Sequence, residues 1–200
     1  LPTSLHGFTI AQISDIHVGP TIKGDYVQSI VGAVNRLQAD MVAVTGDLVD
    51  GSVAQLRSHV APLSGLTSRH GTYFVTGNHE YYSGVTAWVA ELRRLGVKVL
   101  LNEHVVLQHN DGALVIAGVT DHSGHHFDES HRSDPAASVA SAPVDVLRIL
   151  LAHQPRSATA ALQAGFQLQL SGHTHGGQFW PWNFFVRLQQ PFTAGLHRLQ

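Results

Sequence analysis

Short β-branched runs alternate with segments of helical periodicity, and this alternation limits the fold of the chain more than any other feature. Residues 8–13 and 41–45 have the composition of buried strands. Between them lies an apolar stripe at helical spacing, formed by Val27, Ile30, Val31, Val34 and Leu37. Strands that alternate with helices favour an α/β layered fold, because each helix packs on the sheet that its flanking strands form.

The same alternation continues along the chain. We expect further strands over residues 73–76, 97–101, 105–108, 113–119, 147–152 and 166–170. We expect further helices over residues 52–63, 85–95 and 155–164, with Gly96 after the second and Pro155 in the first turn of the third. Asn110, Asp111 and Gly112 form a turn between two strands, which predicts an antiparallel insert in the middle of the fold. The length suits a single domain over residues 1–200.

Composition excludes several function classes. Twelve Lys and Arg against 14 Asp and Glu give a net charge of −2, so no nucleic-acid partner is expected. The absence of cysteine excludes disulfides, thiol nucleophiles and Cys-ligated zinc. Histidine is abundant, with 15 residues, which points to imidazole as a metal ligand or proton carrier. No apolar run approaches the roughly 18 residues of a membrane span.

Polar side chains of the metal-binding type directly follow five of the predicted strands. They are Asp15, His17, Asp47, Asn78, His153, His173 and His175. In open α/β sheets, ligands sit beyond the carboxyl ends of the strands, where these turns converge. Seven oxygen and nitrogen donors exceed the needs of one tetrahedral zinc and fit two metals that share a carboxylate. Glycines allow close backbone approach in these turns, at positions 46, 77, 172, 176 and 177.

These turns contain five motifs in a fixed order: DxH at 15–17, GDxxD at 46–50, GNHE at 77–80, a strand-ending His153 and GHTH at 172–175. With them the chain resembles the calcineurin-like metallophosphoesterases over residues 8–178. The resemblance implies helices on both sides of β-sheets, with the metal site at the carboxyl ends of the strands. It implies one metal held by Asp15, His17, Asp47 and His175. It implies a second held by Asp47, Asn78, His153 and His173, with Asp47 bridging.

The resemblance also assigns two catalytic residues. His79 matches the histidine that faces the scissile phosphate, and Asp50 matches the acid that orients it. Two divalent metals, either Mn²⁺, Zn²⁺ or Fe, are expected to produce a bridging hydroxide for in-line attack. His79 would protonate the leaving oxygen as general acid. A lone histidine after a strand is more often a surface residue, but seven donors in register favour a metal site. Glu80 is interpreted as a helix-entry acid that supports the site.

Three features bear on the substrate. Gly51 follows the GDxxD acid, where phosphoprotein phosphatases of this superfamily carry an arginine, which favours diesters and pyrophosphates over monoesters. The aromatic run at 178–185 is either ordinary packing or an interface for acyl chains and a membrane surface. The loop with His122, His125, His126 and His131 is either solvated or faces substrate or metal.

GHTHGGQ followed by aromatic residues also resembles the membrane-linked bacterial branch of the family. That branch includes phosphodiesterases and a UDP-diacylglucosamine pyrophosphate hydrolase, and its members commonly carry an N-terminal membrane segment or export signal. We therefore expect a bacterial phosphodiesterase or pyrophosphatase, with a lipid-linked substrate and peripheral membrane contact. Two alternatives follow: either the native chain extends beyond residues 1 and 200, or the fold is trimmed. The alternatives are a phosphomonoesterase and a non-catalytic, metal-dependent interaction scaffold.

Overall fold

Two four-stranded sheets form the centre of the computed structural model, which describes residues 2–178, 180–181 and 183–199. The first sheet is parallel, in the order β1-β2-β3-β4, with β1 Ile10–Ile13, β2 Met41–Val44, β3 Thr72–Phe74 and β4 Lys98–Val99. The second has the order β5-β6-β7-β8, with β5 Glu103–His109, β6 Gly112–Gly118, β7 Leu147–Leu151 and β8 Leu168–Leu170. Only the β5–β6 pair is antiparallel among these strands.

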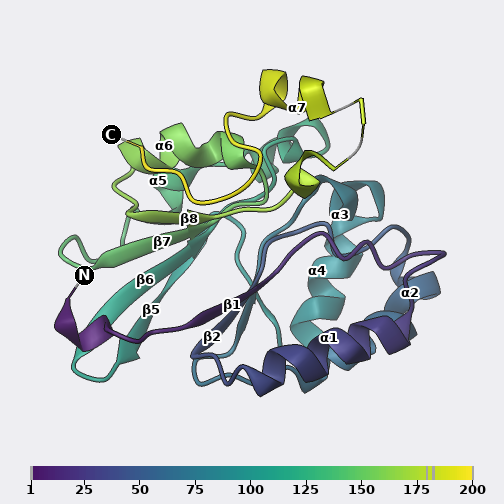
Figure 1. The fold of residues 1–200 in the computed structure, drawn as a ribbon, viewed down its shortest axis with the longest axis horizontal. Coiled ribbons are helices and arrows are strands. Elements are labelled where there is room, and N and C mark those ends of the chain that lie inside the picture. The colour runs from purple at the N-terminus through teal and green to yellow at the C-terminus, as the bar shows by residue number, and fades with distance from the viewer. Residues whose placement is uncertain (1, 179, 182, 200) are drawn as a thin grey trace.

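Helices cover the outer faces of both sheets (Figure 1). The first half of the chain provides α1 Gly24–Arg36, α2 Val53–Val60, α3 Asn78–Tyr82 and α4 Val85–Arg94. The second half provides α5 Pro135–Ser138, α6 Ala158–Gln163 and α7 Asn183–Gln189. Short 3₁₀ turns lie at η1 Thr3–Leu5, η2 Ala61–Gly65, η3 Gly124–His126, η4 Glu129–His131, η5 Pro155–Ser157 and η6 His175–Gly177. In the described part of the chain, no helix is both long and apolar enough to cross a membrane.

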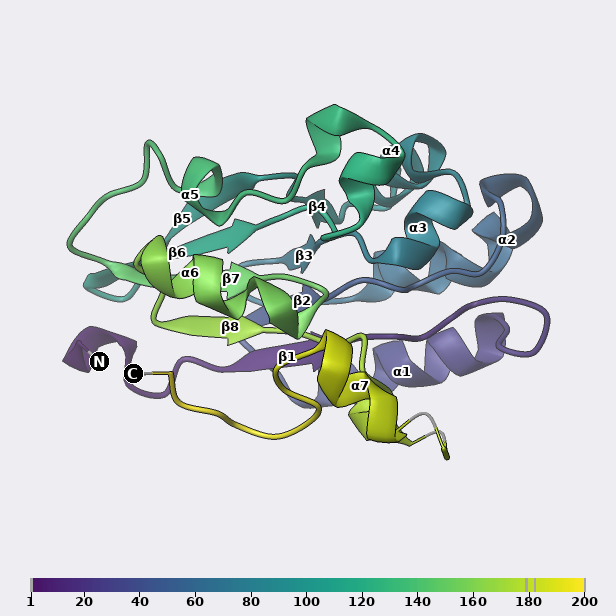
Figure 2. The same ribbon diagram turned by 90° about the horizontal axis from the view of Figure 1, so that it is seen from above.

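Alternating side chains divide the interior into layers. Val42 and Val44 of β2 face the core beneath α1, α2 and α4, whereas Met41 and Ala43 face the core between the two sheets. A third core, which includes Val115, lies between the second sheet and α6. Helices thus enclose two packed sheets, as Figure 2 shows from above, and the expected α/β layered fold is confirmed. Period-two alternation sets this arrangement, because neighbouring side chains on a strand point to opposite faces.

The structure corrects several element boundaries. The β5–β6 hairpin forms at the predicted turn, but it is no insert, since β6 continues the second sheet by pairing in parallel with β7. The predicted helix over 52–63 ends at Val60 and tightens into η2, because Pro62 has no N–H for a helical hydrogen bond. The helix predicted over 155–164 begins as η5 and becomes α6. The polar turn after β3 contains an additional helix, α3.

Candidate metal centre

All seven predicted ligands lie in the segments that follow β1, β2, β3, β7 and β8, at the carboxyl ends of strands from both sheets, with Asn78 beginning α3 and His175 beginning η6. The two sheets are joined there by Gln12, whose Nε2 donates to Thr45 Oγ1 at 2.9 Å and to the Ser171 carbonyl at 3.0 Å. Residues from opposite ends of the chain consequently meet at one edge. His173 N, for example, donates to both carboxylate oxygens of Asp15 at 3.0 Å.

Asp47 lies at the centre of this cluster, and its side chain is buried. Its Oδ2 lies 3.1 Å from His153 Nε2, 3.9 Å from His17 Nε2 and 3.9 Å from His79 Nε2. The other oxygen, Oδ1, accepts the backbone N–H of His79 at 2.9 Å. One carboxylate oxygen thereby faces several ring nitrogens, which is the geometry that a bridging ligand requires.

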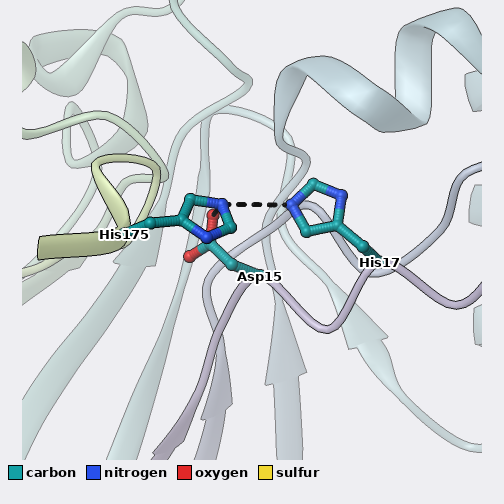
Figure 3. A group of neighbouring side chains, drawn as sticks. All are labelled: Asp15, His17 and His175. Atoms are coloured by element: carbon teal, nitrogen blue, oxygen red, sulfur yellow. Dashed lines mark hydrogen bonds and ion pairs between the residues drawn. The ribbon is translucent and has the colours of Figure 1, made fainter. Parts of the chain in front are cut away.

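One group of donors comes from the two ends of the chain (Figure 3). His175 Nε2 lies 3.4 Å from Asp15 Oδ1 and 3.2 Å from His17 Nε2. The ligand atoms of these three residues lie within 4.8 Å of one another. Two imidazoles and a carboxylate at this spacing suit a divalent cation.

A second group consists of Asp47, His153 and His173, also within 4.8 Å of one another. His173 Nδ1 lies 3.1 Å from His153 Nε2. Nearby, Asn78 Oδ1 is buried and accepts no hydrogen bond. A buried amide oxygen without a partner is costly unless a cation or donor binds it, so Asn78 fits the role predicted for it as a metal ligand.

His79 belongs to a third overlapping group, with His17 and Asp47. Its Nδ1 contacts Asp50 Oδ1 at 2.5 Å, and the same oxygen lies 3.0 Å from His17 Nδ1. Asp50 therefore orients two histidines at once, with both Nε2 atoms directed toward Asp47. The contact of Asp50 with His79 joins two residues that the sequence analysis paired, and its contact with His17 is one that sequence reasoning missed.

The site strongly favours positive charge beside Asp47. Burial opposes ionisation of Asp47, but the hydrogen bond and charge of His153 outweigh it and lower the pKa of Asp47 to about 2. Burial likewise opposes protonation of His153, yet Asp47 raises the pKa of His153 to about 9. The Thr45 carbonyl lies 2.7 Å from His153 Nδ1 and fixes that ring. Burial and the charge of His153 lower the pKa of His173.

Glu80 holds two of the ligand-bearing loops together from beneath. Its Oε2 accepts the backbone N–H of Asp47 at 3.0 Å and of Gly77 at 2.7 Å, and its Oε1 accepts that of Leu48 at 2.8 Å. Glu80 is the third residue of α3, and its bond to the N–H of Gly77 caps the start of that helix. Burial and the charge of Asp47 raise the pKa of Glu80 to about 7. Its predicted supporting role matches these contacts.

Two glycines are required by close approach between loops. A Cβ on Gly77 would lie 2.2 Å from Asp47 Oδ1, and one on Gly172 would lie 2.2 Å from Asp15 Oδ2. Any side chain at either position would displace a predicted ligand. These contacts explain why the GNHE and GHTH turns begin with glycine.

Several predicted ligands hold the backbone in the left-handed region that side chains disfavour. Positive φ occurs at Asp15 (55°), His17 (52°), Asp47 (51°), His173 (73°) and His175 (47°). Each such residue costs on the order of 1 kcal/mol, and such strain gathers at functional sites. No periodicity in the sequence announces these angles, so sequence reasoning missed them.

The loop with His122, His125, His126 and His131 is only partly solvated. Asp121 at its start is buried and accepts Gln154 Nε2 at 3.0 Å, and His131 Nδ1 lies 2.9 Å from Tyr81 Oη. His122 and His126 are exposed. The loop is therefore packed against α3 next to the site, through contacts that sequence reasoning missed.

Part of the aromatic run at 178–185 lies outside the described residues, namely Phe179, Trp182 and the side chain of Phe184. Trp180 is 80% exposed and Phe185 is 52% exposed. Gln190, just after α7, donates from Nε2 to Gln154 Oε1 at 3.0 Å. The residue after α7 therefore contacts the loop that follows His153.

Residues 8–177 match the family model described as calcineurin-like phosphoesterase. The chain belongs to this family. A transmembrane protein with metallophosphoesterase domain from Bos taurus is 43% identical over 100% of the chain and 47% of its own length. An uncharacterized metallophosphoesterase from Campylobacter jejuni is 35% identical over 100% of the chain and 52% of its own length. The chain thus spans about half the length of these curated relatives.

Solved structures support the same fold for this chain. The calcineurin-like phosphoesterase YfkN from Bacillus subtilis has a TM-score of 0.58 at 13% identity, covering 87% of this chain and 73% of that one. The NAD nucleotidase of Haemophilus influenzae has a TM-score of 0.56 at 16% identity, covering 84% of this chain and 38% of that one. At these identities the likeness extends to the fold alone.

Proposed function

We propose that this phosphoesterase uses two divalent metal ions to hydrolyse a phosphodiester or pyrophosphate bond. The observation that carries the proposal is the position of Asp47 Oδ2, within 3.9 Å of ring nitrogens of His17, His79 and His153. The groups around Asp15 and His153 lie on either side of it and supply ligands for one metal each. When bound, two such metals supply a hydroxide nucleophile near neutral pH and neutralise charge on the phosphoryl oxygens. Their identity as Mn²⁺, Zn²⁺ or Fe is left to metal analysis.

His79 provides the proton for the leaving group in this proposal. Asp50 holds the Nδ1 side of the ring, so Nε2 is the atom that transfers a proton to the leaving oxygen. The His79 side chain is 35% exposed, which leaves room for a substrate to reach it. Asp50 orients this ring through the contact with Nδ1.

The GDxxD turn supports a diester or pyrophosphate over a monoester. Position 51 has no side chain, and a Cβ there would lie 3.1 Å from Leu56 Cδ1, on the side of α2. The chain thus has no arginine fork at the position where phosphoprotein phosphatases carry one. A dianionic monoester loses more from this absence, because its extra charge needs a partner.

Apolar exposure near the metal centre supports a substrate with acyl chains. Trp180, between η6 and α7, is 80% exposed, and Leu188, in α7, is 81% exposed. Removal of acyl chains from water onto these side chains would add affinity at roughly 25 cal/mol per Å². The same surface would give peripheral contact with a membrane. A segment outside residues 1–200 would provide the attachment.

Paired substrates test the proposed reaction. With Mn²⁺ or Zn²⁺ supplied, kcat/KM should be about tenfold higher for ethyl 4-nitrophenyl phosphate than for 4-nitrophenyl phosphate. A preference for the monoester would establish the phosphomonoesterase alternative. Metal binding without turnover of either ester would support the scaffold alternative.

The lipid component has a separate test. A diester with a long alkyl chain should gain in kcat/KM over its short-chain homologue, and the double variant Trp180→Ala/Leu188→Ala should remove this gain. Val144→Ala is the matched control, because Val144 is 78% exposed in a loop before β7. Equal losses for both chain lengths would show that these side chains pack against the fold instead.

A further inference from the structure

Two exposed aromatic rings stand beside the candidate acid His79 and have no role in the chemistry described so far. Tyr82, the last residue of α3, is 64% exposed, and Phe127 is 53% exposed. The rings lie 5.7 Å apart between centroids, at 60°. Single exposed apolar side chains are common, but adjoining ones at a reaction centre mark binding surfaces.

The pair is continuous with His79. The Tyr82 and His79 rings lie 5.4 Å apart at 66°, an edge-to-face contact. His79 in turn lies edge-to-face against His17 at 4.5 Å. The aromatic surface therefore begins at the ring that would protonate the leaving oxygen and continues through Tyr82 to Phe127.

The surface is held in place by buried contacts from two separate segments. Tyr81, next to Tyr82, is buried, and its ring lies 5.4 Å from Phe127. Gly124 packs so tightly on Tyr81 that a Cβ would lie 2.6 Å from Tyr81 Oη. Ser123 N donates to Asp121 Oδ1 at 2.8 Å and fixes the start of the loop that carries Phe127. Such support keeps exposed rings in position at low entropic cost.

We propose that Tyr82 and Phe127 form a subsite for a planar aromatic group on the leaving side of the phosphoester. The inference rests on the proposed function, because it uses His79 as the acid at the leaving oxygen. A leaving group bonded to that oxygen must extend past the His79 ring, where the next surface is Tyr82 and then Phe127. Planar groups bind such a surface through offset-stacked or edge-to-face contacts.

Matched diesters test this subsite. Methyl phenyl phosphate and methyl 2-naphthyl phosphate have leaving groups of similar acidity but different aromatic area. The wild type should prefer the naphthyl ester in kcat/KM by about three- to tenfold. Tyr82→Ala/Phe127→Ala should bring the ratio close to one. Leu37→Ala is the control, since Leu37 is exposed at the far end of α1, and it should keep the wild-type ratio.

Binding without turnover separates this inference from the proposed reaction. Calorimetry with the metal-loaded protein compares methyl benzylphosphonate with methyl (2-naphthylmethyl)phosphonate. In both compounds a P–CH₂ bond replaces the bond to the leaving oxygen, so they report on affinity alone. Naphthyl preference lost in the double alanine variant supports the subsite even if neither diester is hydrolysed. An unchanged Kd ratio in that variant overturns it. Tyr82→Leu/Phe127→Leu keeps apolar bulk without rings, and a full preference in this variant would overturn the assignment of a planar group.

Discussion

Single residues at this site combine chemical roles with unfavourable backbone geometry. Asp47 is buried, faces several ring nitrogens and has a φ of 51°. His17 and His175, which lie 3.2 Å apart between Nε2 atoms, share the left-handed conformation. The fold must supply the free energy that holds these residues in this conformation. In the proposed function, the predicted ligands are thereby in position before a cation binds.

The strain at His17 can be measured separately from its side chain. In metal-free protein, His17→Gly should be more stable than His17→Ala by on the order of 1 kcal/mol, because only glycine accepts a φ of 52° without strain. Urea unfolding in the presence of a chelator gives both values. Ala11→Gly in β1, where the backbone is extended, is the control and should destabilise. Equal stability of the two His17 variants would mean that the left-handed backbone stores no strain.

His79 has a prediction that distinguishes an acid from a ligand. His79→Ala should leave metal content near wild type and lower turnover by roughly 10² to 10⁴, the usual effect of a positioned acid. The loss should shrink for esters with very acidic leaving groups, which leave without a proton. Loss of a metal in this variant would instead make His79 a metal ligand, together with His17 and Asp47 of the third donor group.

At the scale of elements, the loops after β2 and β3 depend on one side chain from α3. Glu80→Ala would leave the buried N–H groups of Asp47, Leu48 and Gly77 without their acceptor. We expect a loss of about 3 kcal/mol or more in the free energy of unfolding, together with weaker metal binding. Glu80→Gln keeps an acceptor oxygen and should lose less. If the alanine and glutamine variants unfold at the same denaturant concentration, the hydrogen bonds accepted by Glu80 do not stabilise the fold.

The opposite ends of the strands carry a histidine pair that makes stability depend on pH. His70 Nε2 lies 3.0 Å from His109 Nδ1, and Asp40, Arg69 and Lys98 also face His70. Burial and the charge of His109 lower the pKa of His70 from 6.5. A histidine whose pKa is lower in the folded state than in the unfolded state contributes its full stability above the unfolded-state pKa. This contribution is lost as pH falls through the folded-state pKa.

His70→Gln should therefore flatten the fall in unfolding free energy below pH 6.5 relative to wild type. Urea titrations at a series of pH values in metal-free protein give the slopes. Leu37→Ala is the control, since Leu37 is exposed and has no ionisable side chain, and should leave the slope unchanged. A His70→Gln slope equal to that of wild type would show that the pair is not coupled to folding.

At the scale of the whole molecule, local patterns predicted the order of the strands and of α1, α2, α4 and α6, but missed α3, α5 and α7. They also predicted that the metal-type side chains would lie at one edge. The periodicity of residues 27–37 matches α1, and the glycine-bounded motifs lie on the predicted loops. A hairpin signal at Asn110 could not reveal which sheet the strands join, because pairing of β6 with β7 depends on residues far apart in sequence.

The site was less predictable where distant side chains meet. Asp50 contacts both His17 and His79, and Phe127 approaches Tyr82 from a loop that has no periodic signal. Motifs give residue types and spacing along the chain, whereas these contacts arise from the packing of one loop on another. The resemblance therefore predicted which residues gather and left open how they touch.

The number of metal ions per chain tests the central claim most directly. Elemental analysis of protein loaded with Mn²⁺ or Zn²⁺ should give about two ions per chain for the wild type, as a two-metal site requires. Asp47→Asn should lose both, since Asp47 lies between the two donor groups, and His17→Ala should retain about one. A wild-type protein that never holds more than one ion per chain would contradict the account.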